Sequence, residues 1–88
     1  MRDNSETPLS ELKNFGPKSA DWLYQVGIET LNDLEALGAV EAYLRVKHRF
    51  PKQVSLHLLY ALQATLMNLR WNELPPDIKA ELKVQVME

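Results

Sequence analysis

The residues of this sequence that are best suited to chemistry surround a Gly16-Pro17 step, in the stretch LKNFGPKSADWL. A glycine that ends one helix, followed directly by a proline that begins the next, leaves the first backbone N–H groups of the second helix free. A helix N-terminus carries about half a positive charge, so it attracts anions. Lys13 and Lys18 could flank a bound phosphate, and Ser19 could add its hydroxyl. The pattern predicts a DNA phosphate contact, while the alternative is that the turn is only a corner of the helical core.

A second basic group lies further along the chain, in the stretch RVKHRFPK, which contains no acidic residue. Its cations are Arg45, Lys47, Arg49 and Lys52. They could add positive charge to a DNA contact, but cations near the C-terminus of a helix also stabilise the helix dipole. A second glycine turn at Gly38 is a poorer anion site, because Glu41 falls in the first turn of the helix that follows.

Nothing in the sequence indicates catalysis. There are no cysteines, which excludes disulfides, Cys-based zinc sites and a Cys nucleophile. His48 and His57 lie on either side of a proline, at a spacing that is not typical of metal ligands. Trp22 and Trp71 fit the edge of a core better than a base-stacking platform. We therefore expect a protein that is not an enzyme and that carries no cofactor and no metal.

Size and composition indicate one small globular domain. The chain has 88 residues, 45% of them hydrophobic and 25% charged, and a net charge of −2. A slightly acidic chain is a mild argument against strong non-specific binding of nucleic acid. No apolar run approaches the roughly 20 residues of a membrane helix, and the first residues, MRDNSETP, lack the apolar segment of a signal peptide. We expect a cytosolic (cytoplasmic) protein with a disordered tail over residues 1–8 and a helical domain over residues 9–88.

Helical periodicity and turn residues predict an all-α fold, a small bundle of five to six helices. The expected helices run over about 9–15, from Pro17 to a cap at Gly27, from a cap at Thr30 to Gly38, over about 39–49, over about 55–70 with Ser55 as its cap, and over about 76–86. The helix over 55–70 is apolar nearly all round, so we expect it to be the long central helix. The spacing also places Tyr24 and Leu44 on inward faces.

The first half of the chain contains an internal repeat with a period of 22 residues. The pattern LxxLxxFG recurs as LxxLxxLG, with Gly16 falling on Gly38 and Ala20 on Ala42. Each copy predicts a short helix, a glycine turn and a second helix. The two copies are typical of tandem helix-hairpin-helix (SAM-like) units, although any antiparallel helix pair can show a similar pattern of leucine and glycine.

Four stretches of the sequence carry a family resemblance: NFGPKSADWL, VGIETLNDLEALGAVEAYL, SLHLLYAL and WNELP. In this order and spacing they resemble the C-terminal domain of TfoX/Sxy proteins, which are bacterial regulators of competence for DNA uptake. The resemblance covers about residues 9–79. It implies a bacterial, cytosolic, all-α domain of helix-hairpin-helix or SAM-like character. It also implies a role in transcriptional control of competence genes, beside a CRP-type activator.

Two departures from the family pattern bear on function. Family regulators typically carry another domain before this one, so we expect either an isolated domain or a short paralogue. Asn14 stands where many DNA-binding hairpins place an additional glycine. Asn tolerates left-handed backbone geometry better than most residues, so the exchange is a mild one.

Two functions from different classes are consistent with these patterns. The first is a regulatory module that contacts the backbone of double-stranded DNA. Its candidate contact residues are Lys13, Asn14, Gly16, Lys18, Ser19, Arg45, Lys47, Arg49 and Lys52. The second is a protein-interaction module, in which the acidic stretch 29–41 meets a basic partner or the segment 45–52 of another copy. The latter contact would be head-to-tail self-association.

Overall fold

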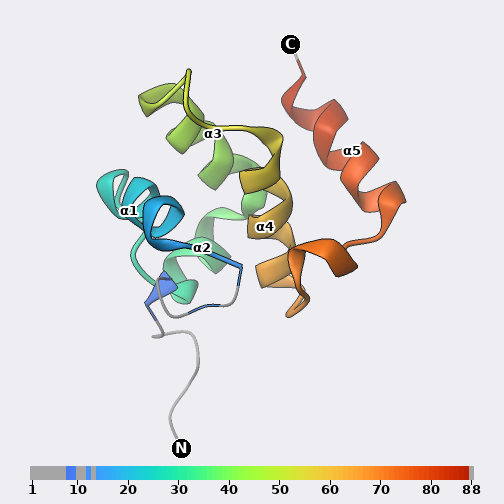
Figure 1. The fold of residues 1–88 in the computed structure, drawn as a ribbon, viewed down its shortest axis with the longest axis horizontal. Helices are drawn as coiled ribbons and strands as arrows, with labels where there is room; N and C mark the ends of the chain where they lie inside the picture. Colours follow the sequence, from blue (N-terminus) through green and yellow to red (C-terminus); the bar gives the residue numbers. More distant parts are fainter. Residues whose placement is uncertain (1–7, 10–11, 13, 88) are drawn as a thin grey trace, which may run out of the picture.

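The computed structural model describes Pro8, Leu9, Leu12 and residues 14–87. Within these residues the chain forms five α-helices and one short 3-10 helix, so the prediction of a small all-α bundle is confirmed. The elements are α1 (Pro17–Gln25), α2 (Leu31–Leu37), α3 (Ala39–Arg49), α4 (Leu56–Leu66), η3 (Trp71–Glu73) and α5 (Pro76–Val86). α4 lies at the centre, and α1 and α5 lie on opposite sides of it (Figure 1).

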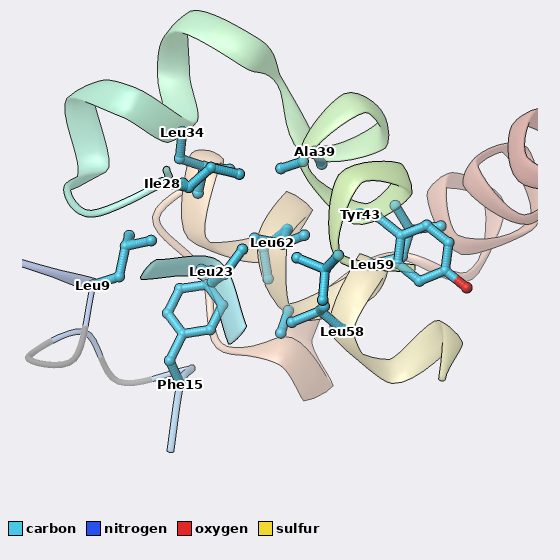
Figure 2. Close-up of a cluster of buried hydrophobic side chains, with 14 of the residues drawn as sticks. Leu9, Phe15, Leu23, Ile28, Leu34, Ala39, Tyr43, Leu58, Leu59 and Leu62 are labelled. Carbon is cyan, nitrogen blue, oxygen red and sulfur yellow. The ribbon is translucent and has the colours of Figure 1, made fainter. Parts of the chain in front are cut away.

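α4 is the core helix because its sequence is apolar on nearly every side. Its residues Leu58, Leu59 and Leu62 are almost completely buried. Figure 2 shows them at the centre of a cluster that includes Leu23 of α1 and Leu34 of α2. Burying one such side chain contributes about 1.5–3 kcal/mol, so the hydrophobic cluster around α4 is the main force that holds the helices together.

The central helix is shorter than the predicted 55–70. α4 ends at Leu66, because Asn68 adopts a left-handed conformation with φ of 59°. The Leu69 N–H then donates to the Ala64 carbonyl over 2.8 Å, which closes the helix with the hydrogen bond of a Schellman motif. Asn is the non-glycine residue that adopts this geometry most readily, so it ends a helix whose apolar pattern continues.

The helix predicted over 9–15 is not an α-helix in the described residues. The Leu12 N–H donates to the Leu9 carbonyl over 3.1 Å, and the Phe15 N–H to the Leu12 carbonyl over 3.3 Å. This three-residue spacing is that of tight turns. Leu9 and Phe15 are nevertheless buried, so the segment fills the core as predicted without being an α-helix. The second copy of the repeat, α2 and α3 joined at Gly38, does form a helical hairpin.

The start of the described chain is tied to the segment before α2. Pro8 forms an isolated antiparallel bridge with Thr30, and the Leu9 N–H donates to the Glu29 carbonyl over 3.1 Å. The tail predicted over residues 1–8 lies, apart from Pro8, outside the described residues.

Two residues that the helical spacing placed inward are exposed instead. Tyr24 is 62% exposed and Leu44 is 42% exposed. In α3 the buried face consists of Ala39, Ala42, Tyr43 and Val46. These four follow the i, i+3, i+4, i+7 pattern of one helix face, and Leu44 lies beside that face rather than on it.

The two glycine turns of the repeat have different backbones. Gly16 is extended, with φ of −86° and ψ of 178°, whereas Gly38 has φ of 83° and ψ of 162°. The latter region is open essentially to glycine alone, and a side chain there costs about 1–3 kcal/mol. An added Cβ meets nothing within 4 Å at either position, so only backbone strain distinguishes them.

We therefore expect Gly38→Ala to lower the free energy of unfolding by about 1–3 kcal/mol. The matched variant Gly16→Ala is expected to change it by less than about 1 kcal/mol, because its backbone suits any residue. Urea unfolding followed by circular dichroism measures both. Equal losses in the two variants would contradict the assigned turn geometries.

Candidate nucleic-acid interface

The start of α1 is an open helix N-terminus at the Gly16 turn. Gly16 and Lys18 are exposed and Ser19 is half-buried. Pro17 occupies the first helical position, and helix geometry leaves the N–H groups of Lys18 and Ser19 without an intrahelical partner. The first turn contains no acidic residue. The positive end of the α1 dipole is therefore accessible to an anion.

Three other α-helices carry their own carboxylate at this end. In α2 the Asp33 carboxylate accepts from the N–H groups of Glu29 and Thr30, over 3.0 and 3.2 Å. These two backbone hydrogen bonds, that from Glu29 first, lower the pKa of Asp33. α3 and α5 have Glu41 and Asp77 in their first turns. A fixed carboxylate repels a further anion, so none of these starts matches that of α1.

The start of α4 also lacks an acidic residue, and it faces the same hollow as the start of α1. Its cap is Ser55, whose hydroxyl accepts from the His57 N–H over 3.3 Å. A hollow of about 290 Å³ lies between the two helix starts. Its lining residues are Asn14, Gly16, Ser19, Trp22, Gln53, Ser55, His57, Leu58 and Ala61. Only Asn14, Gly16 and Ser19 of this lining belong to the predicted contact set.

Sequence reasoning missed Gln53, Ser55 and His57 as neighbours of the Gly16 turn. One signal was present: Ser55 is the expected cap of the long helix, and a cap marks the position of a helix N-terminus. That this N-terminus meets the start of α1 depends on tertiary packing, which the signal does not contain.

Two aromatic rings in contact link one cation of the first predicted basic group to one cation of the second. Lys18 Nζ lies 5.7 Å from the centre of the Trp22 ring, and the Trp22 and Phe50 ring centres are 6.1 Å apart. Arg49 Cζ lies 5.0 Å from the centre of the Phe50 ring. We call Trp22 and Phe50 the aromatic bridge. Lys52 is exposed in the turn that follows Phe50, next to Gln53 of the hollow.

Two of the predicted cations are engaged elsewhere. Arg45 Nε donates to Glu41 Oε2 over 3.1 Å in an exposed pair. Such a pair within one helix contributes only about 0.3–0.5 kcal/mol. Lys47 Nζ donates to the carbonyls of Pro51 and Val54, over 3.0 and 3.1 Å. Lys47 therefore holds the loop after α3. Because Arg45 and Lys47 are engaged in these contacts, we do not include them among the residues proposed to contact DNA.

Asn14 is turned into the fold. Its side-chain Nδ2 donates to Thr65 Oγ1 over 3.0 Å and to the Leu69 carbonyl over 2.8 Å. Its Oδ1 accepts from the Trp71 N–H over 2.9 Å. The whole amide is used to join the Gly16 turn to the end of α4, so the geometry gives Asn14 a structural role. Lys13 of the predicted set lies outside the described residues.

Trp22 and Trp71 have different environments. Trp22 is half-buried against the core, at the core edge as predicted. Trp71 is 45% exposed and packs against His57 in a T-shaped arrangement, with ring centres 4.7 Å apart. Among the described residues, no group of three His, Asp or Glu side chains is placed to hold a metal ion. No helix in this part of the chain is long and apolar enough to cross a bilayer.

Comparison with known proteins gives one family and one solved structure. The family model of the TfoX C-terminal domain matches residues 5–86. The chain is also similar to the crystal structure of an uncharacterized protein from Listeria monocytogenes, at 36% identity and a TM-score of 0.81. That similarity covers 88% of this chain and 86% of the other. No curated protein matched the sequence.

We expect Asn14→Ala to lower the free energy of unfolding by about 2–4 kcal/mol, because three hydrogen bonds at about 0.5–1.5 kcal/mol each are lost. Asn14→Asp should be at least as damaging despite its equal size. Its second oxygen faces the Leu69 carbonyl, and the Thr65 hydroxyl already donates to the Ala61 carbonyl over 2.8 Å.

The control for these variants is Asn72→Ala, at an exposed position of η3. It should change the free energy of unfolding by less than about 0.5 kcal/mol. Thermal unfolding of the four chains provides the comparison. An Asn14→Asp chain as stable as the wild type would show that the Asn14 amide does not hold this turn.

Proposed function

The chain belongs to the family of TfoX C-terminal domains, and we propose that it is a non-catalytic regulatory module that associates with DNA through the start of α1. In this role the N–H groups of Lys18 and Ser19 donate to phosphate oxygens of the duplex, and the Lys18 ammonium adds a charge-assisted contact. Arg49 and Lys52 extend the contact along the backbone.

One observation carries the proposal: the start of α1 is exposed, has no acidic residue in its first turn and carries Lys18, and it shares a hollow with the acid-free start of α4. Phosphate contacts of this kind fix position and orientation on DNA without reading its sequence. Because the net charge is −2, we expect the contact to be confined to this face rather than spread over the surface.

We propose that this association serves the control of competence genes in the bacterial cytoplasm, beside a CRP-type transcription activator. The family to which the chain belongs supports a regulatory role. A module that positions itself on the DNA backbone would leave sequence recognition to such a partner.

A second candidate function is binding of a protein partner. A hollow of about 410 Å³ beside α3 has Val26 and the exposed Leu44 as apolar lining and Arg45, His48 and Arg49 as basic lining. Its acidic lining residue, Glu41, is paired with Arg45, and the basic residues outnumber it. This combination favours an acidic, partly apolar partner. The segment 29–41 of another copy is one such partner, and the contact would be self-association. A chain that sediments as a monomer at low salt, whatever its concentration, would exclude self-association.

We expect Lys18→Glu to weaken binding of a short random duplex strongly and to reduce the slope of log affinity against log salt by about 1 or more. The control is Lys83→Glu, which makes the same change of charge on an exposed position of α5. α5 lies on the opposite side of α4 from α1 (Figure 1), so the exchanged charge lies away from the proposed contact.

Fluorescence anisotropy of a labelled duplex, at about 50 mM and about 200 mM salt, measures both variants. The proposal requires Lys83→Glu to bind nearly as the wild type does. Equal weakening by the two variants would mean that only net charge matters, and a wild-type chain that does not bind at the lower salt would refute DNA association.

A further inference from the structure

Lys18 and Arg49 differ from the other cations of the predicted set in what they touch. Arg45 is paired with a carboxylate, and Lys47 donates to two backbone carbonyls. Within the described part of the chain, Lys18 and Arg49 form no ion pair, and each lies over the face of an aromatic ring. A carboxylate neutralises the cation beside it, whereas an aromatic face attracts the cation and leaves its charge in place.

The two rings are themselves fixed. Trp22 and Phe50 are half-buried, and both pack against the hydrophobic core. They also lie against each other, with ring centres 6.1 Å apart and planes inclined by 33°. Long cationic side chains are otherwise free to adopt many rotamers, and ordering them on binding is a cost that weakens affinity. A fixed ring beneath each cation reduces that cost before the ligand arrives.

The bridge also joins elements that are remote in the sequence. Lys18 lies in the first turn of α1, and Arg49 is the last residue of α3. The contacts run from Lys18 to Trp22, from Trp22 to Phe50, and from Phe50 to Arg49. The relative position of the two charges is therefore set by packing of the rings and not by the loops between the helices.

We propose that Lys18 and Arg49 form one paired-cation site for two phosphates of a DNA backbone, and that Trp22 and Phe50 are the positioning residues of this site. The inference rests on the proposed DNA association and names the four side chains that would together hold two phosphates of the DNA. It assigns a binding role to two aromatic residues whose ring faces support cations instead of stacking on bases.

The test compares removal of a charge with removal of its support. Arg49→Gln and Lys18→Gln each remove one phosphate contact, so each should lower the affinity for a short duplex and reduce the salt slope by about 1. Phe50→Leu keeps both charges and a similar apolar volume. It should lower the affinity by about two- to fivefold, the contribution of an exposed cation–aromatic contact, without changing the salt slope. Phe50→Tyr keeps the aromatic face and should bind as the wild type does.

A second measurement examines the contact in the free protein. The side-chain CH₂ protons of Arg49 should be shifted upfield in the NMR spectrum by the ring current of Phe50, and Phe50→Leu should abolish that shift. If Phe50→Leu does not fold, Trp22→Phe replaces it, because the smaller ring attracts Lys18 less strongly and should lower the affinity about twofold.

The outcomes separate the two proposals. If Arg49→Gln weakens binding while Phe50→Leu and Phe50→Tyr both bind as the wild type does, the positioning role is wrong and DNA association stands. If neither Gln variant weakens binding of a wild type that does bind, the paired-cation site is wrong. A wild type that binds no DNA overturns both.

Discussion

The position of the proposed binding face depends on the Asn14 amide, which fastens the turn before α1 to the end of α4 and to η3. Its three hydrogen bonds reach Thr65, Leu69 and Trp71, which are between 51 and 57 residues away in the chain. The segment before Gly16 forms no α-helix in the described residues. It therefore lacks the regular series of i to i+4 backbone hydrogen bonds that would fix its conformation. The Asn14 amide and the buried side chains of this segment hold it in position instead. As a consequence, the position of the start of α1 is fixed.

The same constraint explains how structure and proposed binding share one short stretch. Asn14 and Phe15 face the fold, while Gly16 and Lys18 are exposed. The Gly16 turn is therefore both a corner of the core and an open helix N-terminus, and the two interpretations that the sequence allowed are not exclusive. Use of Asn in place of an additional glycine strengthens the attachment to α4, and it leaves the N–H groups after Pro17 accessible.

Local signals in the sequence predicted most of the fold, and the missing parts are those that depend on distant contacts. Thr30, Gly38 and Ser55 mark helix ends through their own side chains or backbone, and each lies where it was expected. The exposure of Leu44 was not predictable, because helical periodicity gives the direction of the buried face but not the width of the face that neighbouring helices cover. The link from Lys18 to Arg49 was equally hidden, since it runs through two aromatic rings that carry no signal of their own.

The proposed DNA association requires the start of α1 to be a phosphate site. The most direct measurement is an NMR titration of the isotope-labelled chain with a short random duplex, first at about 50 mM and then at about 200 mM salt. If phosphates bind at the start of α1, the amide shifts centre on Gly16, Lys18 and Ser19 at the lower salt and fade at the higher. Amides that do not shift even at the lower salt would contradict it, and the Gly-Pro turn would then be only a corner of the core.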